Sequence, residues 1–274
     1  MKSFRYATFA VAASLFMTTL IFSPASCVER SGGKRELPLD YSMKRVEKSY
    51  SNRKSPEKYP TYCRASYPHF SGGANADSIN LKVHSYIADS TGLRLDEAKG
   101  GAHSIEALSE AFLRGYEAFR IERASGEIPW QFDLNGAVLL NRSGILTLDI
   151  TFYSFTGGAH GMSHTEYLVF DTNSGRRMGL ADVFLPGYEV RLNELVDGRF
   201  RQLKGLSKTD PLDGEEGGLV ENVIRFNKNF AVTDKGVLFL YNVYEIAPYV
   251  NGSTELSLTW RDLKPLLQPR FRNF

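Results

Sequence analysis

The fold is decided by residues 145–170, which read ILTLDITFYSFTGGAHGMSHTEYLVF. Aromatic and β-branched side chains dominate residues 145–155 and 162–170, and such side chains favour β-strands. The connection between them, residues 156–161, is rich in glycine, which readily adopts the positive φ angles that turns require. The sequence therefore predicts a hairpin of two antiparallel strands, and the rest of the chain is interpreted around it.

Further strands and helices are predicted on both sides of this hairpin. The other expected extended segments are residues 59–62, 67–70, 129–140, 229–232, 237–243 and 255–259. Apolar side chains recur at helical spacing in helices that begin at Asp77 or Ser78, at Ser104 and near Leu192, and in a short helix over residues 260–267. The predicted fold class is α+β, with antiparallel sheets and flanking helices in two subdomains, residues 59–170 and 171–268.

The start of the chain has the features of a secretory signal peptide. Lys2 and Arg5 precede an apolar run over residues 7–22, and small residues follow it before Cys27. The run is shorter than the ~20 residues of a membrane-spanning helix, which argues against an uncleaved anchor. We therefore interpret residues 1–27 as a signal peptide and expect the protein to be exported.

The two cysteines leave two alternatives open for the mature N-terminus. Cys27 stands where a bacterial lipoprotein carries its lipidated cysteine, although Pro24 occupies a position at which such signals usually have leucine. Cleavage after Ala25 would instead leave Cys27 free to form a disulfide with Cys63 in an oxidising compartment. Both alternatives place the protein outside the cytoplasm, in the periplasm or as a membrane-anchored lipoprotein. We expect membrane contact only through a lipid on Cys27.

Composition and charge exclude several classes of protein. The chain is 42% hydrophobic and 23% charged, as is ordinary for globular proteins. Residues 28–58 carry nine basic and five acidic side chains and few apolar ones, which predicts a flexible tether. Residues 59–274 carry 22 basic and 26 acidic side chains. This excess of acidic residues argues against a nucleic-acid partner.

Catalytic and metal-binding patterns are weak in this sequence. His160 and His164 are the obvious metal candidates, but four residues of a strand span about 13 Å, whereas Zn–N bonds are about 2 Å. Ser163, beside His164, lacks the G-x-S-x-G pattern of a nucleophile elbow. We therefore expect no metal and no cofactor. A pair of carboxylates for glycan hydrolysis stays open, because any two of the 31 acidic residues could meet in the fold.

Two loops are candidates for partner recognition. Residues 156–161 combine glycines, which permit close approach of another backbone, with a histidine. Residues 244–252 hold two tyrosines, a residue type enriched in interfaces. In each case a structural alternative is equally open: a hairpin connection that needs glycine, or a loop that packs on its own core. The predicted partner-binding residues are Gly157, Gly158, His160, Gly161, Tyr244, Pro248 and Tyr249.

Several separated motifs resemble a known extracytoplasmic module. The motifs of the first half are YPHFSG (67–72), ADSIN (76–80) and YSFTGGAHG (153–161). Those of the second half are LADVF (180–184), YEIAPY (244–249) and LTWRDLKPLL (258–267). They are similar, in the same order, to the module of RsiV-like anti-sigma factors, and a similar module precedes the catalytic domain of PdaC-like peptidoglycan deacetylases. The resemblance covers about residues 60–268.

The resemblance implies a binding function. In the anti-sigma members the module is a lysozyme receptor whose loops engage the substrate cleft of lysozyme. Six residues precede the apolar run and seven follow Leu267, so we expect neither a sigma-binding nor a deacetylase domain. The sequence therefore predicts an exported module that acts by binding rather than catalysis. The expected partner is lysozyme, another peptidoglycan-processing protein or peptidoglycan, and the alternative is a cell-wall glycan hydrolase with an unidentified carboxylate pair.

Overall fold

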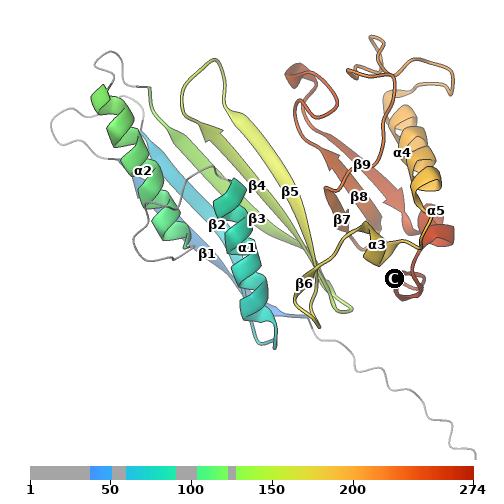
Figure 1. Ribbon diagram of the computed structural model, residues 1–274, viewed down its shortest axis with the longest axis horizontal. Helices are drawn as coiled ribbons and strands as arrows, with labels where there is room; N and C mark the ends of the chain where they lie inside the picture. The colour runs from blue at the N-terminus through green and yellow to red at the C-terminus, as the bar shows by residue number, and fades with distance from the viewer. Residues whose placement is uncertain (1–37, 51–59, 91–103, 123–127) are drawn as a thin grey trace, which may run out of the picture. The chain divides into compact units, whose positions relative to one another are not determined.

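The predicted hairpin lies within the larger of two sheets. The computed structural model describes residues 38–50, 60–90, 104–122 and 128–274, and in it β4 (Ile145–Phe155) pairs antiparallel with β5 (Met162–Asp171) (Figure 1). Consecutive side chains at the start of β4, from Ile145 to Leu148, are all fully buried. Because alternate side chains of a strand point to opposite faces, both faces of the sheet are covered at this point.

Among the described residues, six strands form this sheet in the order β1 to β6. Besides β4 and β5 they are β1 (Asp40–Ser49), β2 (Tyr62–Ser71), β3 (Gln131–Arg142) and β6 (Arg176–Arg177). The α+β class is confirmed, but β2 and β3 pair in parallel where we predicted antiparallel pairing. The reason is that the chain between these strands contains two helices, and a parallel pair requires such a crossover.

Strand β1 corrects the prediction that residues 28–58 are a flexible tether. β1 pairs antiparallel with β2 along its whole length, and its Val46 is 8% exposed in the core. An edge strand needs few apolar side chains, because the neighbouring strand supplies backbone hydrogen bonds whatever the composition. Residues 28–37 and 51–58 lie outside the described residues, as does the predicted signal peptide 1–27.

Two helices cover one face of the six-stranded sheet. α1 (Ala76–Ser90) begins one or two residues before the predicted start at Asp77 or Ser78. Its first turn is closed by the N–H of Ile79, which donates to the carbonyl of Asn75 at 3.0 Å. α2 (Ile105–Glu122) begins where expected, with Ser104 Oγ accepting from the N–H of Ala107 at 3.1 Å. The buried residues of α2 are Ile105, Leu108, Ser109, Phe112 and Tyr116. This stripe matches the predicted apolar spacing and packs the helix on the sheet.

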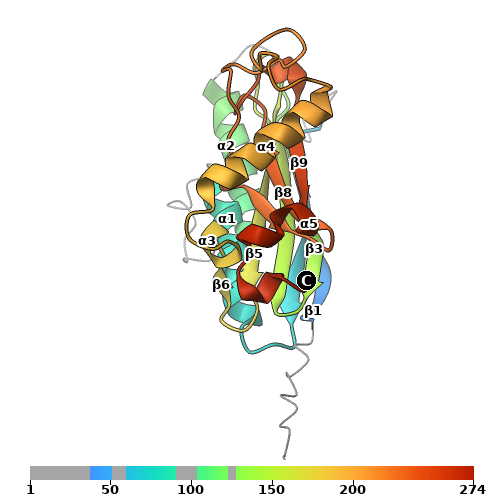
Figure 2. The same ribbon diagram turned by 90° about the vertical axis from the view of Figure 1, so that its right-hand side faces the viewer.

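The second sheet is three-stranded and antiparallel. Its strands are β7 (Phe230–Val232), β8 (Gly236–Tyr241) and β9 (Thr254–Thr259). The helices of this half are α3 (Leu180–Val183), α4 (Glu189–Lys204) and α5 (Trp260–Leu263), with 3₁₀ turns η2 (Tyr249–Asn251), η3 (Lys264–Leu266) and η4 (Pro269–Phe271). Figure 2 shows α4 lying across β8 and β9. Leu192, Val196 and Phe200 of α4 are fully buried in this core.

The other face of the six-stranded sheet packs against the second half of the chain. Tyr167 of β5 is buried with Ala231 and Leu240 of the second sheet. Ile145 and Val169 belong to the same apolar cluster as α4. The two predicted subdomains therefore share buried surface, and the described residues from 38 onward belong to one compact unit. None of the helices in the described ranges combines the length and the apolar character that crossing a bilayer demands.

Two asparagine side chains pair with the edge of β5 that faces the second half. Asn242 accepts from the N–H of Thr165 at 2.8 Å and donates to its carbonyl at 3.0 Å. Asn229 accepts from the N–H of Tyr167 at 2.8 Å and donates to the carbonyl of Thr165 at 2.7 Å. We call this pair the asparagine clasp. It satisfies backbone groups of β5 that a neighbouring strand would otherwise pair.

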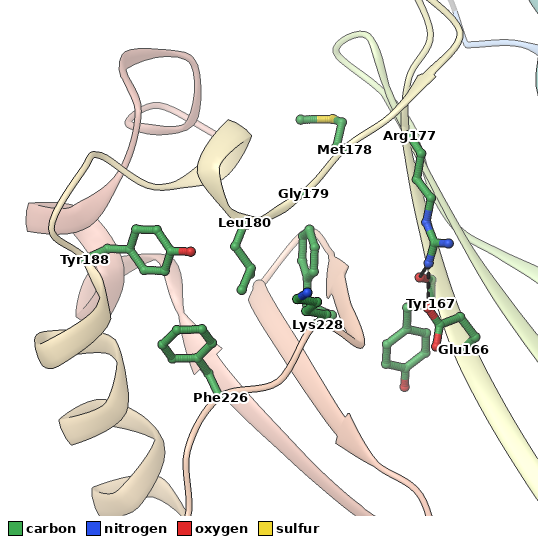
Figure 3. A pocket seen from close by; sticks show the side chains of 10 residues that line it. Glu166, Tyr167, Arg177, Met178, Gly179, Leu180, Tyr188, Phe226 and Lys228 are labelled. Carbon is green, nitrogen blue, oxygen red and sulfur yellow. Dashed lines mark hydrogen bonds and ion pairs between the residues drawn. The ribbon is translucent and has the colours of Figure 1, made fainter.

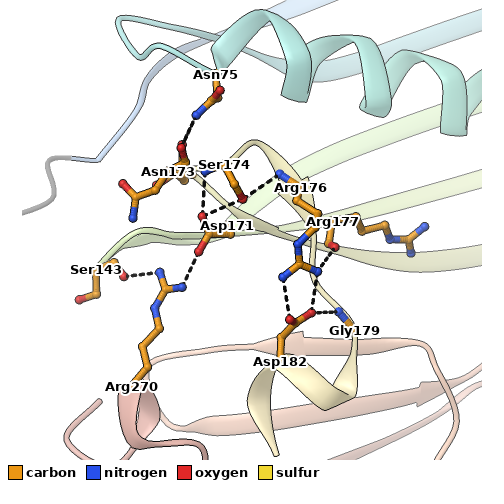
Figure 4. Close-up of polar contacts among 11 residues, drawn as sticks. Asn75, Ser143, Asp171, Asn173, Ser174, Arg176, Arg177, Gly179, Asp182 and Arg270 are labelled. Atoms are coloured by element: carbon orange, nitrogen blue, oxygen red, sulfur yellow. Dashed lines mark hydrogen bonds and ion pairs between the residues drawn. The ribbon is translucent and has the colours of Figure 1, made fainter.

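A polar network joins the two halves at the far end of β5 (Figure 4). Arg270 donates to Asp171 at 2.5 Å and to the carbonyl of Ser143 at 3.1 Å. Arg176 donates two hydrogen bonds to Asp182, of 2.9 and 2.6 Å. The hydrogen bond from Arg176 is the main reason why the pKa of Asp182 lies below its usual value. This network holds the chain leaving β5 and the C-terminal segment together.

Candidate functional site

The two loops predicted to bind a partner lie against each other in the structure. The ring of His160, between β4 and β5, stacks on the ring of Tyr249 with centroids 4.1 Å apart and 24° between the planes. Tyr244 contacts Tyr249 at a centroid distance of 5.4 Å. Pro248 precedes η2 and leads Tyr249 into this contact. His160 and Tyr244 are 84 residues apart in the chain, so the fold creates this cluster.

Hydrogen bonds hold the three rings together. The hydroxyl of Tyr249 donates to the carbonyl of Gly161 at 3.2 Å. Nδ1 of His160 lies 2.9 Å from the same carbonyl, which can only accept, so Nδ1 carries the proton in this arrangement. Nε2 of His160 is then free to accept from the hydroxyl of Tyr244 at 3.5 Å. The cluster is therefore positioned before any partner binds.

Glycine is required in residues 156–161 for two reasons. Gly157 and Gly158 have φ angles of +107° and +100°, which side chains other than glycine rarely adopt. At Gly161 a Cβ atom would lie 2.3 Å from the hydroxyl oxygen of Tyr153. The connection between β4 and β5 therefore needs these glycines for its own conformation, as the structural alternative predicted. In this conformation the ring of His160 stacks on that of Tyr249.

Tyr244 has an unusual backbone conformation. Its φ angle is +66°, in the left-handed region that non-glycine residues seldom occupy. A tight turn imposes this angle: Glu245 accepts from the N–H of Asn242 at 2.8 Å and donates its own N–H to the carbonyl of Asn242 at 3.0 Å. Asn227 fixes the same carboxylate at 2.7 Å. Strain of this kind gathers at functional sites, and here it turns the tyrosine outward, where it is 55% exposed.

A third loop, which sequence reasoning missed, completes the surface. The N–H of Val220 donates to the carbonyl of Ile246 at 2.9 Å, so residues 217–223 lie beside residues 244–252. Val220 is 68% exposed and Val250 89% exposed. We define the aromatic loop surface as His160, Val220, Val223, Tyr244, Tyr249 and Val250. The signal in the sequence was the pair of valines that follows a glycine- and acid-rich loop.

A shallow hollow lies within this surface. It has a volume of about 220 Å³ and is lined by Val220, Val223, Tyr244 and Ile246 together with two carboxylates, Glu221 and Glu245. Exposed apolar side chains next to a hollow and rimmed by charge are typical of protein-binding sites.

The other histidine and serine candidates are placed differently. The ring of His164 contacts Phe152 at 5.4 Å, whereas His160 stacks on Tyr249. Ser163 and His164 are neighbours in β5, so their side chains point to opposite faces of the sheet. Within the described ranges, no three His, Cys, Asp or Glu side chains are grouped as metal ligands.

Asp149 and Glu255 are a pair of carboxylates that interact electrostatically between the two sheets. Burial is the main cause that raises the pKa of Asp149 on β4, and the charge of Glu255 on β9 raises it further. Thr151 donates to Asp149 at 2.7 Å, and the hydroxyl of Tyr167 donates to Glu255 at 2.6 Å. Asp149 is half-buried and Glu255 exposed. These two residues are the specific candidates for the alternative hydrolase hypothesis.

Cys63 lies in the core, on β2. It is 1% exposed, and its thiol is 3.3 Å from the hydroxyl of Ser109 on α2. Burial raises the pKa of the thiol, while the hydrogen bond to Ser109 acts in the opposite direction. Cys27, the other member of the predicted lipidation or disulfide site, lies outside the described residues.

Comparisons with known proteins support the resemblance seen in the motifs. Residues 55–163 match the family model described as deacetylase PdaC, and residues 181–261 match the one described as protein of unknown function (DUF3298). A comparison with curated proteins finds no match.

Two crystal structures share the fold. One is a member of the DUF3298 family from Bacteroides fragilis, with a TM-score of 0.70 and 21% identity over 85% of this chain and 94% of that chain. The other is a DUF3298 family protein from Pseudomonas aeruginosa, with a TM-score of 0.63 and 20% identity over 85% of this chain and 96% of that chain.

These findings define the class of this protein. It is an α+β module whose first part is similar to the PdaC family model and whose second part is similar to the DUF3298 family model, in agreement with the resemblance seen in the motifs. The two family matches together indicate a module associated with the bacterial cell envelope.

Proposed function

We propose that the protein is an exported cell-envelope module that binds a lysozyme-like protein through the aromatic loop surface. The observation that carries this proposal is the meeting of His160, Tyr244 and Tyr249, which two loops distant in sequence bring into one exposed cluster. The resemblance to lysozyme-sensing modules supports the choice of partner.

The composition of the aromatic loop surface suits a protein partner. Tyrosine supplies a large, rigid contact area with a polar hydroxyl, and it is enriched among residues that dominate binding energy. The hydrogen bonds from Tyr249 to Gly161 and from Tyr244 to His160 already order the rings. Binding therefore loses little side-chain entropy, which favours affinity.

The charge around the surface favours a basic partner. Glu221 and Glu245 line the hollow, and the nearby segment 211–221 contains no basic residue. Complementary charge steers association and raises its rate. We expect the association rate to fall as the salt concentration rises, because salt screens exposed charges.

Isothermal titration calorimetry with a chicken-type lysozyme and with purified peptidoglycan tests the proposal. Truncating an interface tyrosine that dominates binding costs about 2 kcal/mol or more, which corresponds to about thirtyfold in affinity. We expect Tyr249→Ala and Tyr244→Ala to weaken lysozyme binding by about this factor. Val250→Ala and Val190→Ala form a matched pair, because Val190 on α4 is 74% exposed but lies outside the aromatic loop surface.

The thermal midpoint of each variant is measured on the same samples. Unchanged affinity in a folded protein that carries His160→Ala, Tyr244→Ala and Tyr249→Ala together would contradict the proposal. Binding of peptidoglycan alone would assign the surface to the glycan instead. Glycan turnover that Glu255→Gln or Asp149→Asn abolishes would place the protein among cell-wall hydrolases.

Export is part of the same proposal. Intact mass measurement of the envelope fraction is expected to show loss of the signal peptide. A diacylglyceryl mass on Cys27 would identify a lipoprotein, whereas a mass lower by two hydrogen atoms, without lipid, would indicate a disulfide with Cys63. A mature chain that begins at Met1 would contradict export by cleavage.

A further inference from the structure

A second, separate cavity lies beside β5. Its volume is about 440 Å³, within the usual range for sites that bind small molecules. The walls come from β5, the segment between β6 and α3, the start of α4 and the chain that leads into β7 (Figure 3). The apolar side chains of the wall are Tyr167, Met178, Leu180, Phe226 and Phe230. None of these residues belongs to the aromatic loop surface.

Two polar groups of this cavity have no partner among the described residues. The hydroxyl of Tyr188 is directed toward Leu180 in Figure 3, and no hydrogen bond is formed by it within the described chain. Burial raises the pKa of Tyr188, so its hydroxyl stays protonated and can donate at neutral pH. Lys228 is exposed at the cavity, and its ammonium group forms no ion pair or hydrogen bond in the described ranges. Both groups are donors.

The remaining charges of the wall neutralise each other. Arg177 donates to Glu166 at 2.5 Å and to the carbonyl of Tyr167 at 3.4 Å. Figure 3 shows this ion pair on the side of the cavity opposite Tyr188. Lys228 therefore leaves the lining with one unbalanced positive charge.

The glycine in the lining keeps space open. Gly179 has φ −111° and ψ 178°, an extended conformation that any residue adopts. A Cβ atom at this position would have no atom within 4 Å. Neither the backbone angle nor steric contact with the described residues thus requires glycine here. Its effect is to leave room at the cavity.

We propose that this cavity binds a small organic anion, with one carboxylate on an apolar body. The carboxylate accepts from Lys228, the apolar body lies against Leu180, Phe226 and Phe230, and the hydroxyl of Tyr188 offers a second donor on the wall. An isolated anion without an apolar body would leave most of the wall uncovered, and an apolar molecule without charge would leave the positive charge of Lys228 without a counter-charge.

The volume sets the size of the ligand. A cavity of about 440 Å³ lies in the lower half of the ~300–1,000 Å³ range of sites that bind small molecules, which favours a ligand of modest size with a single carboxylate. Decanoate is therefore a suitable probe.

Calorimetric titration of the full mature chain with four probes tests the ligand class. The probes are decanoate, decanol, decyltrimethylammonium and acetate. We expect decanoate to bind, decanol and the cation to bind at least about tenfold more weakly, and acetate to show no binding at about 1 mM, since charged hydrogen bonds contribute ~1.5–3 kcal/mol.

Variants of the cavity test the residues. Lys228→Met should weaken decanoate binding about tenfold or more, while Lys228→Arg should retain it within about threefold, because the positive charge is kept. Lys208→Met is the matched control, since it makes the same change of charge at an exposed position outside the lining. Gly179→Leu should weaken binding by occupying the open space, with the thermal midpoint nearly unchanged.

Three results would overturn the inference. They are equal affinity for decanoate and decanol, an equal effect of Lys228→Met and Lys208→Met, and no decanoate binding at about 1 mM by the folded protein. Lysozyme binding by the same variants separates this inference from the proposed function, because Lys228 and Gly179 lie outside the aromatic loop surface.

Discussion

Replacing Asn229 by alanine should remove much of the stability of the protein. Asn229 is 7% exposed, and its amide pairs with the N–H of Tyr167 and with the carbonyl of Thr165. The carbonyl keeps a second donor in Asn242, but the N–H of Tyr167 loses its acceptor. A buried donor without a partner costs about 1–3 kcal/mol and a lost hydrogen bond about 1 kcal/mol, which together predict a loss of about 2–4 kcal/mol.

The measurement is urea denaturation at neutral pH, extrapolated linearly to water. A loss of this size is a large part of the ~5–15 kcal/mol that ordinarily separates folded from unfolded chains. Asn242→Ala should cost less, because Asn242 is only half-buried and water can replace its amide. Asn251→Ala is the control, since Asn251 is exposed, and it should stay within about 0.5 kcal/mol of the unmodified protein.

The Asn229→Asp variant tests separately the hydrogen bond that the Asn229 amide donates to the carbonyl of Thr165. An ionised carboxylate accepts from Tyr167 but cannot donate to Thr165, and it places a charge in the interior. Its destabilising effect should therefore shrink at acid pH, where the protonated carboxyl can donate again. A loss below about 0.5 kcal/mol for Asn229→Ala would refute the reasoning, because it would mean that β5 does not depend on the asparagine clasp.

Three further predictions follow from burial and pairing. The pKa of Asp149 is raised in the folded state, so the stability linked to its protonated form is lost as pH rises. Asp149→Asn, which carries no charge, should therefore raise the thermal midpoint at neutral pH. This gain should vanish below pH ~4, where the carboxyl of the unmodified protein is protonated as well. Cys63 is buried, so it should react with a thiol reagent at least about a hundredfold more slowly in the native than in the unfolded protein. If Cys63 does not react after unfolding without a reducing agent, it is in a disulfide. Deleting residues 1–50 should lower the thermal midpoint by about 10 °C or more, because this removes β1. An unchanged midpoint would instead support the interpretation of residues 28–58 as a flexible tether.

Local patterns in the sequence were sufficient for most elements of the fold. The β4–β5 hairpin, the apolar stripe of α2 and the three strands of the second sheet were predicted at nearly their observed bounds. Each depends on side chains close together in the chain, and these set both the period of burial and the turn between elements. For the same reason the sequence is sufficient to mark Gly157 and Gly158 as candidates, because a glycine-rich connection between two strands favours positive φ angles.

Elements that depend on a distant neighbour were missed or misjudged. β1 was interpreted as a tether, because a polar edge strand has no apolar signature of its own and is held by the backbone of β2. The parallel pairing of β2 and β3 was missed, since sequence periodicity does not state the direction of a partner strand. Asn229 and Asn242 gave no signal, because an asparagine can pair with any backbone that the fold brings near.

The candidate site divides in the same way. The sequence by itself determined the chemistry of the two loops: glycines with positive φ angles, one histidine and two tyrosines. Only the tertiary structure decided that His160 stacks on Tyr249, that Val220 lies beside Ile246, and that a cavity opens next to Lys228. The physical reason is that side-chain chemistry is a property of each residue, whereas the distance between residues far apart in the chain is set by how the two sheets pack.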